Sequence, residues 1–338
     1  MKVSCKAIDL PFRHPFTISK GTKTHQPSLL VALGSGGLTG FGEAPAITYY
    51  DITVEKMMAD LGARRRTLEG FAFTQPERFW HFLHHLIPGN PFLVCALDIA
   101  GWDLFGKLQG APLYRLWNAD PAASPVTDYT IGIDTIDRMV HKMNEMRWPV
   151  YKIKLGTDQD VEIIRNLRRH TEALFRIDAN AAWTSREALE KIRAFADLGV
   201  EFIEQPLATG DREGMRFLFE HSPLPLIADE SCVAEKDVDA CHGYFHGINI
   251  KLTKCSGITP ARRMIARARA LGMKVMIGSM NESTVGTAAI AQLMPFVDYA
   301  DADGPLLLAE DVATGIGFER GRIVYSGAPG TGISMEPF

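Results

Sequence analysis

Charged residues recur at similar intervals through the C-terminal part of the sequence, each at the end of a short apolar stretch. The stretch YKIKLG carries Lys152 and Lys154 two residues apart. Because side chains alternate between the two faces of a strand, both lysines would project from one face while Ile153 and Leu155 occupy the other. A lone Lys-x-Lys pair most often marks a solvated edge strand, so its meaning depends on the residues that the fold places around it.

Three single carboxylates follow the lysine pair along the chain. Asp178 lies in RIDAN, Glu204 in FIEQP and Asp229 in IADES. Each alone would be interpreted as a helix cap or a solvated acid, but three acids at one level of neighbouring strands would repel each other unless a cation lay between them. The pattern therefore predicts a metal site. Because all the ligands are hard oxygens, we expect Mg²⁺, with Mn²⁺ as a substitute.

Lys251, in the segment NIKLTK, completes the candidate catalytic set. In an eight-stranded barrel its strand is the sixth and the strand of Lys152 and Lys154 is the second, so the two strands lie opposite each other. A substrate carboxylate at the metal site would then have an amine on each face of its α-carbon. Removal of the α-proton creates an enediolate dianion, which a divalent cation and an ammonium group stabilise. A lysine acts as a base once nearby positive charge or burial lowers its pKa from about 10.4, and Lys152 is placed to do this to Lys154.

The elements that must position these residues form an alternating pattern from about residue 125 onward. Helical stretches separate eight strand candidates, which are VTDYTIGI, VYKIKLG, LFRIDAN, VEFIEQP, LPLIADES, GINIKLT, KVMIGSM and VDYADAD. The polar strand ends from Lys154 to Asp301 are spaced 24, 26, 25, 22, 28 and 22 residues apart. This count and spacing predict an α/β fold with a parallel sheet closed into a TIM-type barrel, whose active site lies at the C-terminal ends of the strands.

The first part of the chain has a different pattern. KVSCKAIDLPF and SLLVALGSGGLTGFGEA read as strands, and TVEKMMADLGARRR and PFLVCALDIAGWDLFGKLQG as helices. The Gly-rich GSGGLTG opens no helix, so it predicts a hairpin turn and not a phosphate site. GFERGRIVYSG predicts a second hairpin, which could return to the first domain. We predict an N-terminal α+β domain over 1–118, completed by about 319–338, and a catalytic barrel over 124–318.

Composition narrows the functional class. The 338 residues are 46% hydrophobic and 22% charged, as in an ordinary globular protein. The net charge is −4, and the sequence has no long runs of charges of one sign, so nothing in it indicates binding to nucleic acid or to a membrane surface. The five cysteines form no CxxC pair, and the N-terminus lacks the apolar core of a signal peptide. We therefore expect a cytoplasmic protein that acts on a small molecule. His81 and His85 are four residues apart, but no third candidate ligand accompanies them, which argues against a zinc site there.

The combined pattern resembles the muconate-lactonizing subgroup of the enolase superfamily. The resemblance rests on the Lys-x-Lys of strand two, the acids of strands three to five and the lysine of strand six, and it covers almost the whole chain. It implies a modified TIM barrel, (β/α)7β, with an N-terminal capping domain. It also implies that Lys154 and Lys251 are the acid–base pair, with Lys152 as an electrostatic helper. Many relatives assemble, so a homo-oligomer is compatible with it.

The end of strand eight, Asp301-Ala302-Asp303, resembles the DxD motif of the dipeptide epimerases of that subgroup. Two carboxylates beside the substrate would suit an α-ammonium group. The resemblance thus implies epimerisation of the C-terminal residue of a dipeptide by two-base 1,1-proton transfer. The alternatives are an N-acylamino acid racemase, an o-succinylbenzoate synthase or a cycloisomerase of the same superfamily. A more remote alternative is a non-catalytic, metal-dependent binding protein.

The early loop PFTISKGTKTH, which covers the barrel mouth in this superfamily, carries Lys20, Lys23 and His25 but no acid. A basic loop favours a distal carboxylate on the second residue, as in L-Ala-D/L-Glu, a murein-derived dipeptide, although these lysines could simply be solvated. Thr130 on strand one and Ser279 on strand seven are further candidate substrate contacts, from position and resemblance.

Overall fold

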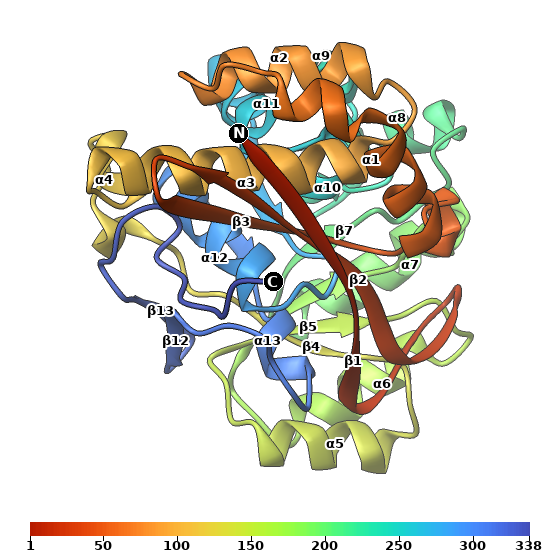
Figure 1. Cartoon of the computed structure of the whole chain (residues 1–338). Coiled ribbons are helices and arrows are strands. Elements are labelled where there is room, and N and C mark those ends of the chain that lie inside the picture. Colours follow the sequence, from red (N-terminus) through yellow and green to blue (C-terminus); the bar gives the residue numbers. More distant parts are fainter.

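Eight parallel strands form the centre of the fold in the computed structural model, which describes residues 1–338 (Figure 1). They are β4 (Tyr129–Ile131), β5 (Val150–Lys154), β6 (Leu174–Asp178), β7 (Val200–Glu204), β8 (Leu226–Ala228), β9 (Gly247–Lys251), β10 (Lys274–Gly278) and β11 (Tyr299–Asp301). Each strand is hydrogen-bonded to the next one in chain order. A bridge between Thr127 and Ala300, with a 3.1 Å hydrogen bond from Asp128 N to Ala300 O, links the two ends of the sheet. The predicted eight-stranded barrel is confirmed.

Helices cover the outside of the barrel between successive strands. They are α5 (Ile136–Glu145), α6 (Asp160–Arg168), α7 (Ser185–Ala196), α8 (Arg212–His221), α9 (Glu235–Cys241), α10 (Leu252–Cys255), α11 (Ile258–Ala270) and α12 (Thr284–Leu293), with the 3₁₀ turn η3 (Met294–Phe296). The 3₁₀ turn η2 (Pro121–Ala123) precedes β4, and α13 (Gly304–Leu307) follows β11. Helix α7 shows why they form there: a capping box of Thr184 and Glu187 starts it, and apolar residues at helical spacing face the strands. Only the four-residue α13 follows β11, so the barrel has the predicted (β/α)7β form.

An antiparallel sheet and a layer of helices precede the barrel. The elements are β1 (Lys2–Ile18), β2 (Gly21–Ser35), β3 (Leu38–Pro45), η1 (Thr48–Tyr50), α1 (Val54–Glu69), α2 (Pro76–Leu86), α3 (Pro91–Gln109) and α4 (Leu113–Leu116). Gly36 and Gly37 turn β2 into β3 with φ of 61° and 79°, which confirms the predicted hairpin turn. Helix α3 packs tightly on β3, because a Cβ on Gly42 would lie only 2.0 Å from Ala96 O.

The hairpin of β1 and β2 reaches from this domain to the barrel mouth, where the long strands cross in front of the barrel in Figure 1. Thr17 O, near the tip, accepts a hydrogen bond of 2.9 Å from Ile133 N in the loop after β4. Gly132 lies directly beneath the hairpin, since a Cβ there would approach Thr17 O to 2.9 Å. The hairpin tip therefore sits over the ends of the barrel strands.

The C-terminal segment contacts both parts of the chain. Its hairpin consists of β12 (Ile316–Glu319) and β13 (Arg322–Tyr325), as predicted. Gly321 O, in the turn, accepts a 2.8 Å hydrogen bond from Thr127 N at the start of the barrel. Beyond the hairpin, Thr331 N donates to Asp103 Oδ1 on α3 at 2.8 Å. None of the helices combines the length and apolar character needed to cross a bilayer.

Candidate active site

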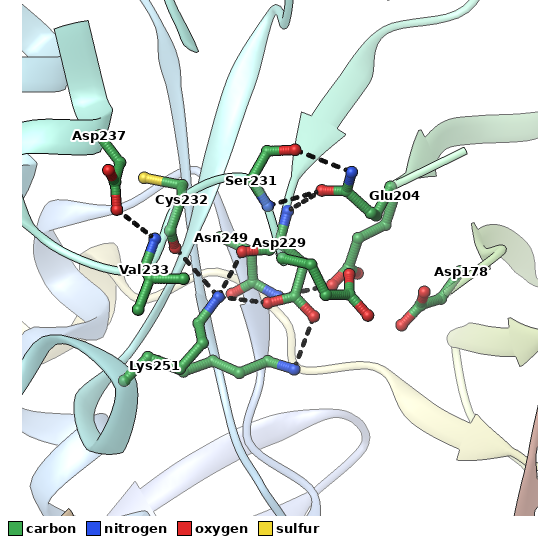
Figure 2. Close-up of polar contacts among 12 residues, drawn as sticks. Asp178, Glu204, Asp229, Ser231, Cys232, Val233, Asp237, Asn249 and Lys251 are labelled. Atoms are coloured by element: carbon green, nitrogen blue, oxygen red, sulfur yellow. Dashed lines mark hydrogen bonds and ion pairs between the residues drawn. The ribbon is translucent and has the colours of Figure 1, made fainter. Parts of the chain in front are cut away.

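Asp178, Glu204 and Asp229 meet at the C-terminal end of the barrel. Asp178 and Glu204 are the last residues of β6 and β7 and are register partners, and Asp229 directly follows β8. One carboxylate oxygen of each lies within 4.8 Å of the other two, and all three residues are buried. Figure 2 shows the three carboxyl groups turned toward the same space. The barrel thus brings together the three predicted metal ligands.

The chemistry of these acids fits a divalent cation. Burial and the neighbouring Asp178 raise the pKa of Glu204 to about 7, which reflects the crowding of negative charge. Glu204 Oε1 accepts a 2.8 Å hydrogen bond from Asn249 Nδ2. Glu204 Oε2 accepts no hydrogen bond but lies 2.8 Å from Lys152 Nζ, within ion-pair distance. Three buried carboxylates, all hard oxygen ligands, are the donor set that Mg²⁺ and Mn²⁺ prefer. The residues present therefore fit the expected ion.

Two of the acids pair with the two lysines that were predicted to exchange protons with substrate. Lys154 Nζ lies 2.6 Å from Asp178 Oδ2, and Lys251 Nζ lies 2.9 Å from Asp229 Oδ2. Although burial alone would raise it, Lys154 holds the pKa of Asp178 at about 2. Burial alone would lower the pKa of Lys251, but Asp229 and the other acids raise it above its ordinary value. The acids around Lys251 therefore stabilise its ammonium form, and Lys154 stabilises the carboxylate form of Asp178.

Lys152 lies deeper than the other two lysines and is fully buried. Its Nζ is 2.8 Å from Glu204 Oε2, 2.7 Å from Asp301 Oδ2 and 3.3 Å from Asp178 Oδ2. Burial alone would lower the pKa of this ammonium group, but Asp301, Glu204 and Asp178 together hold it well above its ordinary range. Lys152 thus places a fixed positive charge among the acids and is not part of a solvated strand face.

A cavity of about 240 Å³ opens above the acids, between the barrel mouth and the β1–β2 hairpin. The predicted site residues that line it are Lys20, Lys23, Thr130, Lys154, Asp229, Lys251, Ser279 and Asp301. The predicted site residues outside the lining are Lys152, Asp178, Glu204 and Asp303. Residues that sequence reasoning missed also line it, among them Tyr49 and Tyr50 at η1 and Glu230 after Asp229. No sequence pattern indicates Tyr49 and Tyr50, because η1 lies in a loop of the N-terminal domain, whereas Glu230 directly follows a predicted metal ligand.

The two lysines of the hairpin have different surroundings. Lys20 Nζ forms a 2.8 Å ion pair with Glu230 and lies 3.8 Å from the centre of the Tyr49 ring. Lys23 Nζ donates to Gln26 Oε1 at 3.2 Å and has no acid within ion-pair distance, and burial lowers its pKa. Both lysines reach the cavity, but only Lys23 does so without a counter-charge.

Asp301 and Asp303 are both buried but differ in position. Asp301 lines the cavity, and although burial alone would raise it, Lys152 and Lys154 lower its pKa. Asp303 Oδ2 accepts a 2.6 Å hydrogen bond from Thr130 N, while its Oδ1 accepts none. Burial and Asp301 raise the pKa of Asp303 to about 7. Asp301 alone of the two therefore faces the cavity, while Asp303 holds Thr130 in the wall.

Lys254 is a buried charge at the site that sequence reasoning missed. It lies in α10, the short helical turn after β9, and its Nζ donates to Asp229 Oδ1 at 2.5 Å and to Cys232 O at 3.0 Å. Together with Lys251 it fixes both oxygens of Asp229. The available signal was a second lysine in NIKLTK, three residues after Lys251.

Asp160, at the start of α6, holds together the loops that follow β5 and β6. Its Oδ1 accepts from Gly156 N (3.1 Å), Thr157 N (2.8 Å) and Thr157 Oγ1 (2.9 Å). Its Oδ2 accepts from Trp183 Nε1 (2.7 Å) and Lys191 Nζ (2.8 Å). Asp160 is fully buried and lies outside the cavity, so its role is to support the strand ends that carry the charged residues.

Family models and known proteins similar to this chain point to the same superfamily as the arrangement of these residues. Residues 2–117 match the family model of the mandelate racemase / muconate lactonizing enzyme N-terminal domain, and residues 135–338 match the enolase C-terminal domain-like model. The L-Ala-D/L-amino acid epimerase of Flavobacterium johnsoniae is 49% identical over 99% of this chain and 100% of its own length.

Solved structures of dipeptide epimerases share the fold. The substrate-liganded L-Ala-D/L-Glu epimerase from Bacillus subtilis has a TM-score of 0.93 at 29% identity, covering 98% of this chain and 99% of that one. The dipeptide epimerase from Cytophaga hutchinsonii, complexed with Mg and D-Ala-L-Val, has a TM-score of 0.93 at 26% identity, covering 99% and 95%. The resemblance inferred from the sequence is confirmed. The chain belongs to the mandelate racemase / muconate lactonizing enzyme family of the enolase superfamily.

Proposed function

We propose that the protein is a Mg²⁺-dependent dipeptide epimerase, which inverts the α-carbon of the C-terminal residue by two-base 1,1-proton transfer. The observation that carries this proposal is the placement of Lys154 and Lys251 in the lining of one cavity, directly above the three acids. Their strands, β5 and β9, are the second and sixth of eight and so lie opposite each other across the barrel. An α-carbon between them has a proton acceptor on one face and a proton donor on the other.

The metal ligands and the three lysines have different roles in this mechanism. Mg²⁺ bound by the three acids would neutralise the substrate carboxylate and the charge that develops when the α-proton leaves. One lysine, as the neutral amine, takes the α-proton, and the opposite lysine, as the ammonium ion, gives a proton to the other face. Either lysine can begin, depending on the configuration of the substrate. Lys152 remains protonated among the acids and supplies a permanent positive charge below the reacting carbon.

The position of Asp301 favours a dipeptide as the substrate over the other substrates of the superfamily. A dipeptide carries a free α-ammonium group, and Asp301 presents a buried carboxylate in the cavity lining. N-acylamino acids, cycloisomerase substrates and o-succinylbenzoate precursors carry no such group. The Flavobacterium johnsoniae relative is an L-Ala-D/L-amino acid epimerase, which supports alanine as the first residue of the dipeptide. Lys23, without an acidic partner, supports acceptance of an acidic second residue, as in L-Ala-D/L-Glu.

Incubation with a dipeptide library and Mg²⁺ in D₂O, read by mass spectrometry and chiral separation, tests the proposal. We expect L-Ala-L-Glu and related dipeptides to gain one deuterium at the C-terminal α-carbon and to form both epimers. A protein that only binds would leave the α-proton in place. Faster turnover of N-acylamino acids than of the free dipeptides would identify an N-acylamino acid racemase instead.

A further inference from the structure

An ion pair in the cavity wall joins the N-terminal domain to the barrel. Lys20, in the turn between β1 and β2, and Glu230, next to Asp229, are 210 residues apart in the sequence. Lys20 Nζ and Glu230 Oε1 lie 2.8 Å apart, and the side chains are 28% and 8% exposed. Both residues line the cavity, on the side where Tyr49 stacks over the Lys20 ammonium group.

This pair cancels one of the two positive charges that the hairpin brings to the cavity. A substrate carboxylate that approached Lys20 would have to compete with Glu230, which is already in contact and largely shielded from water. Lys23 has no such competitor. The part of the cavity lined by the β1–β2 hairpin therefore presents one uncompensated ammonium group, not the two that a basic loop would suggest.

Glu230 would itself become an uncompensated charge if Lys20 were absent. Its second oxygen, Oε2, is buried and has no hydrogen-bond partner. Neutralising Glu230 would therefore leave the positive charge of Lys20 unpaired in the cavity wall, and neutralising Lys20 would leave the negative charge of Glu230 unpaired.

We propose that Glu230 is a specificity-determining residue, which acts through Lys20 to limit the preference of the site for dipeptides with an acidic second residue. The proposal rests on the dipeptide epimerase activity proposed above.

The test compares kcat/KM for L-Ala-L-Glu with that for L-Ala-L-Gln, which has the same shape without the charge. Glu230→Gln frees Lys20, so we expect the Glu-to-Gln ratio to rise about tenfold, equivalent to ~1.4 kcal/mol, through a lower KM for the acidic dipeptide. Lys20→Met frees Glu230, so the ratio should fall and L-Ala-L-Lys should become a better substrate. The double variant should return toward the wild-type ratio.

Glu235→Gln is the matched control, because it breaks a 2.6 Å ion pair with Arg263 outside the cavity and should leave the ratio unchanged. A uniform loss of turnover on both dipeptides in Glu230→Gln, or an unchanged ratio in both single variants, would overturn the proposal. If Glu230→Gln does not fold, the Lys20→Met ratio alone decides. Absence of turnover of either dipeptide by the wild type would instead contradict the proposed function itself.

Discussion

Replacing Asp160 by alanine should weaken both the fold and the catalytic centre, although Asp160 does not touch the cavity. Its carboxylate accepts five hydrogen bonds that join the loop after β5 to the loop after β6. Lys154 ends the first of these strands and Asp178 ends the second. The variant should therefore loosen the 2.6 Å contact between Lys154 and Asp178.

The size of the effect follows from what the substitution leaves behind. Lys191, whose side chain is 18% exposed, loses its counter-charge, and the indole of Trp183 loses its acceptor. Removing one partner of a buried ion pair costs about 3–5 kcal/mol, and an unsatisfied buried donor costs about 1–3 kcal/mol. Gly156 and Thr157 are half-buried, so water can replace part of their lost bonds. We expect a loss of about 3–5 kcal/mol in the free energy of unfolding.

Urea denaturation measures the free energy of unfolding, and epimerisation kinetics measure the catalytic effect. Asp160→Asn keeps an acceptor of similar shape and should lose less than Asp160→Ala. Asp158→Ala, at an exposed position of the same loop, should change stability by less than about 0.5 kcal/mol. A loss below about 1 kcal/mol in Asp160→Ala, with unchanged kcat/KM, would refute the assigned role.

Three further predictions concern the metal, the ammonium receptor and an interdomain acid. Mg²⁺ should raise the Tm, EDTA should abolish turnover, and Glu204→Gln should lose most of the Mg²⁺-induced rise; an equal rise in the variant would contradict the metal site. Asp301→Asn should raise KM about 10- to 100-fold for free dipeptides but not for N-acetylated ones, because a charged hydrogen bond contributes about 1.5–3 kcal/mol; equal effects on both would exclude the ammonium contact. Asp98 of α3 accepts a 2.9 Å hydrogen bond from Thr259 N of α11, across the two domains. Burial raises the pKa of Asp98 from 3.8 to about 7, so between these values the folded state keeps a proton that the unfolded state has released. Wild-type stability should therefore fall as pH rises through this range, by up to about 1.4 kcal/mol per pH unit, relative to Asp98→Asn. Parallel urea-stability profiles would contradict that pKa.

The barrel and its charged strand ends could be predicted because they depend on short-range patterns. Alternating strands and helices define the sheet, and regular spacing places Asp178, Glu204 and Asp229 at its C-terminal edge. The lysines of β5 and β9 follow from the same rule. These residues need no knowledge of the loops, since backbone pairing alone fixes their level in the barrel.

The surroundings of the site could not be predicted, because they depend on contacts between distant segments. The ion pair of Lys20 and Glu230 joins residues 210 positions apart, and no local pattern indicates it. Asp301 and Asp303 look equivalent in the sequence, but the chain turns after β11 and directs only Asp301 to the cavity lining. Lys254 depends on the helical turn α10, which is too short to show a periodicity.

The stereochemistry of α-proton exchange in single-lysine variants tests the two-base scheme most directly. In D₂O with Mg²⁺, Lys154→Ala and Lys251→Ala should each fail to epimerise a dipeptide that the wild type converts. Each variant should still exchange the α-proton of one epimer through its remaining lysine, and the two variants should act on opposite epimers. Full epimerisation by both variants, or exchange of the same epimer by both, would contradict the assignment of these lysines to opposite faces of the substrate.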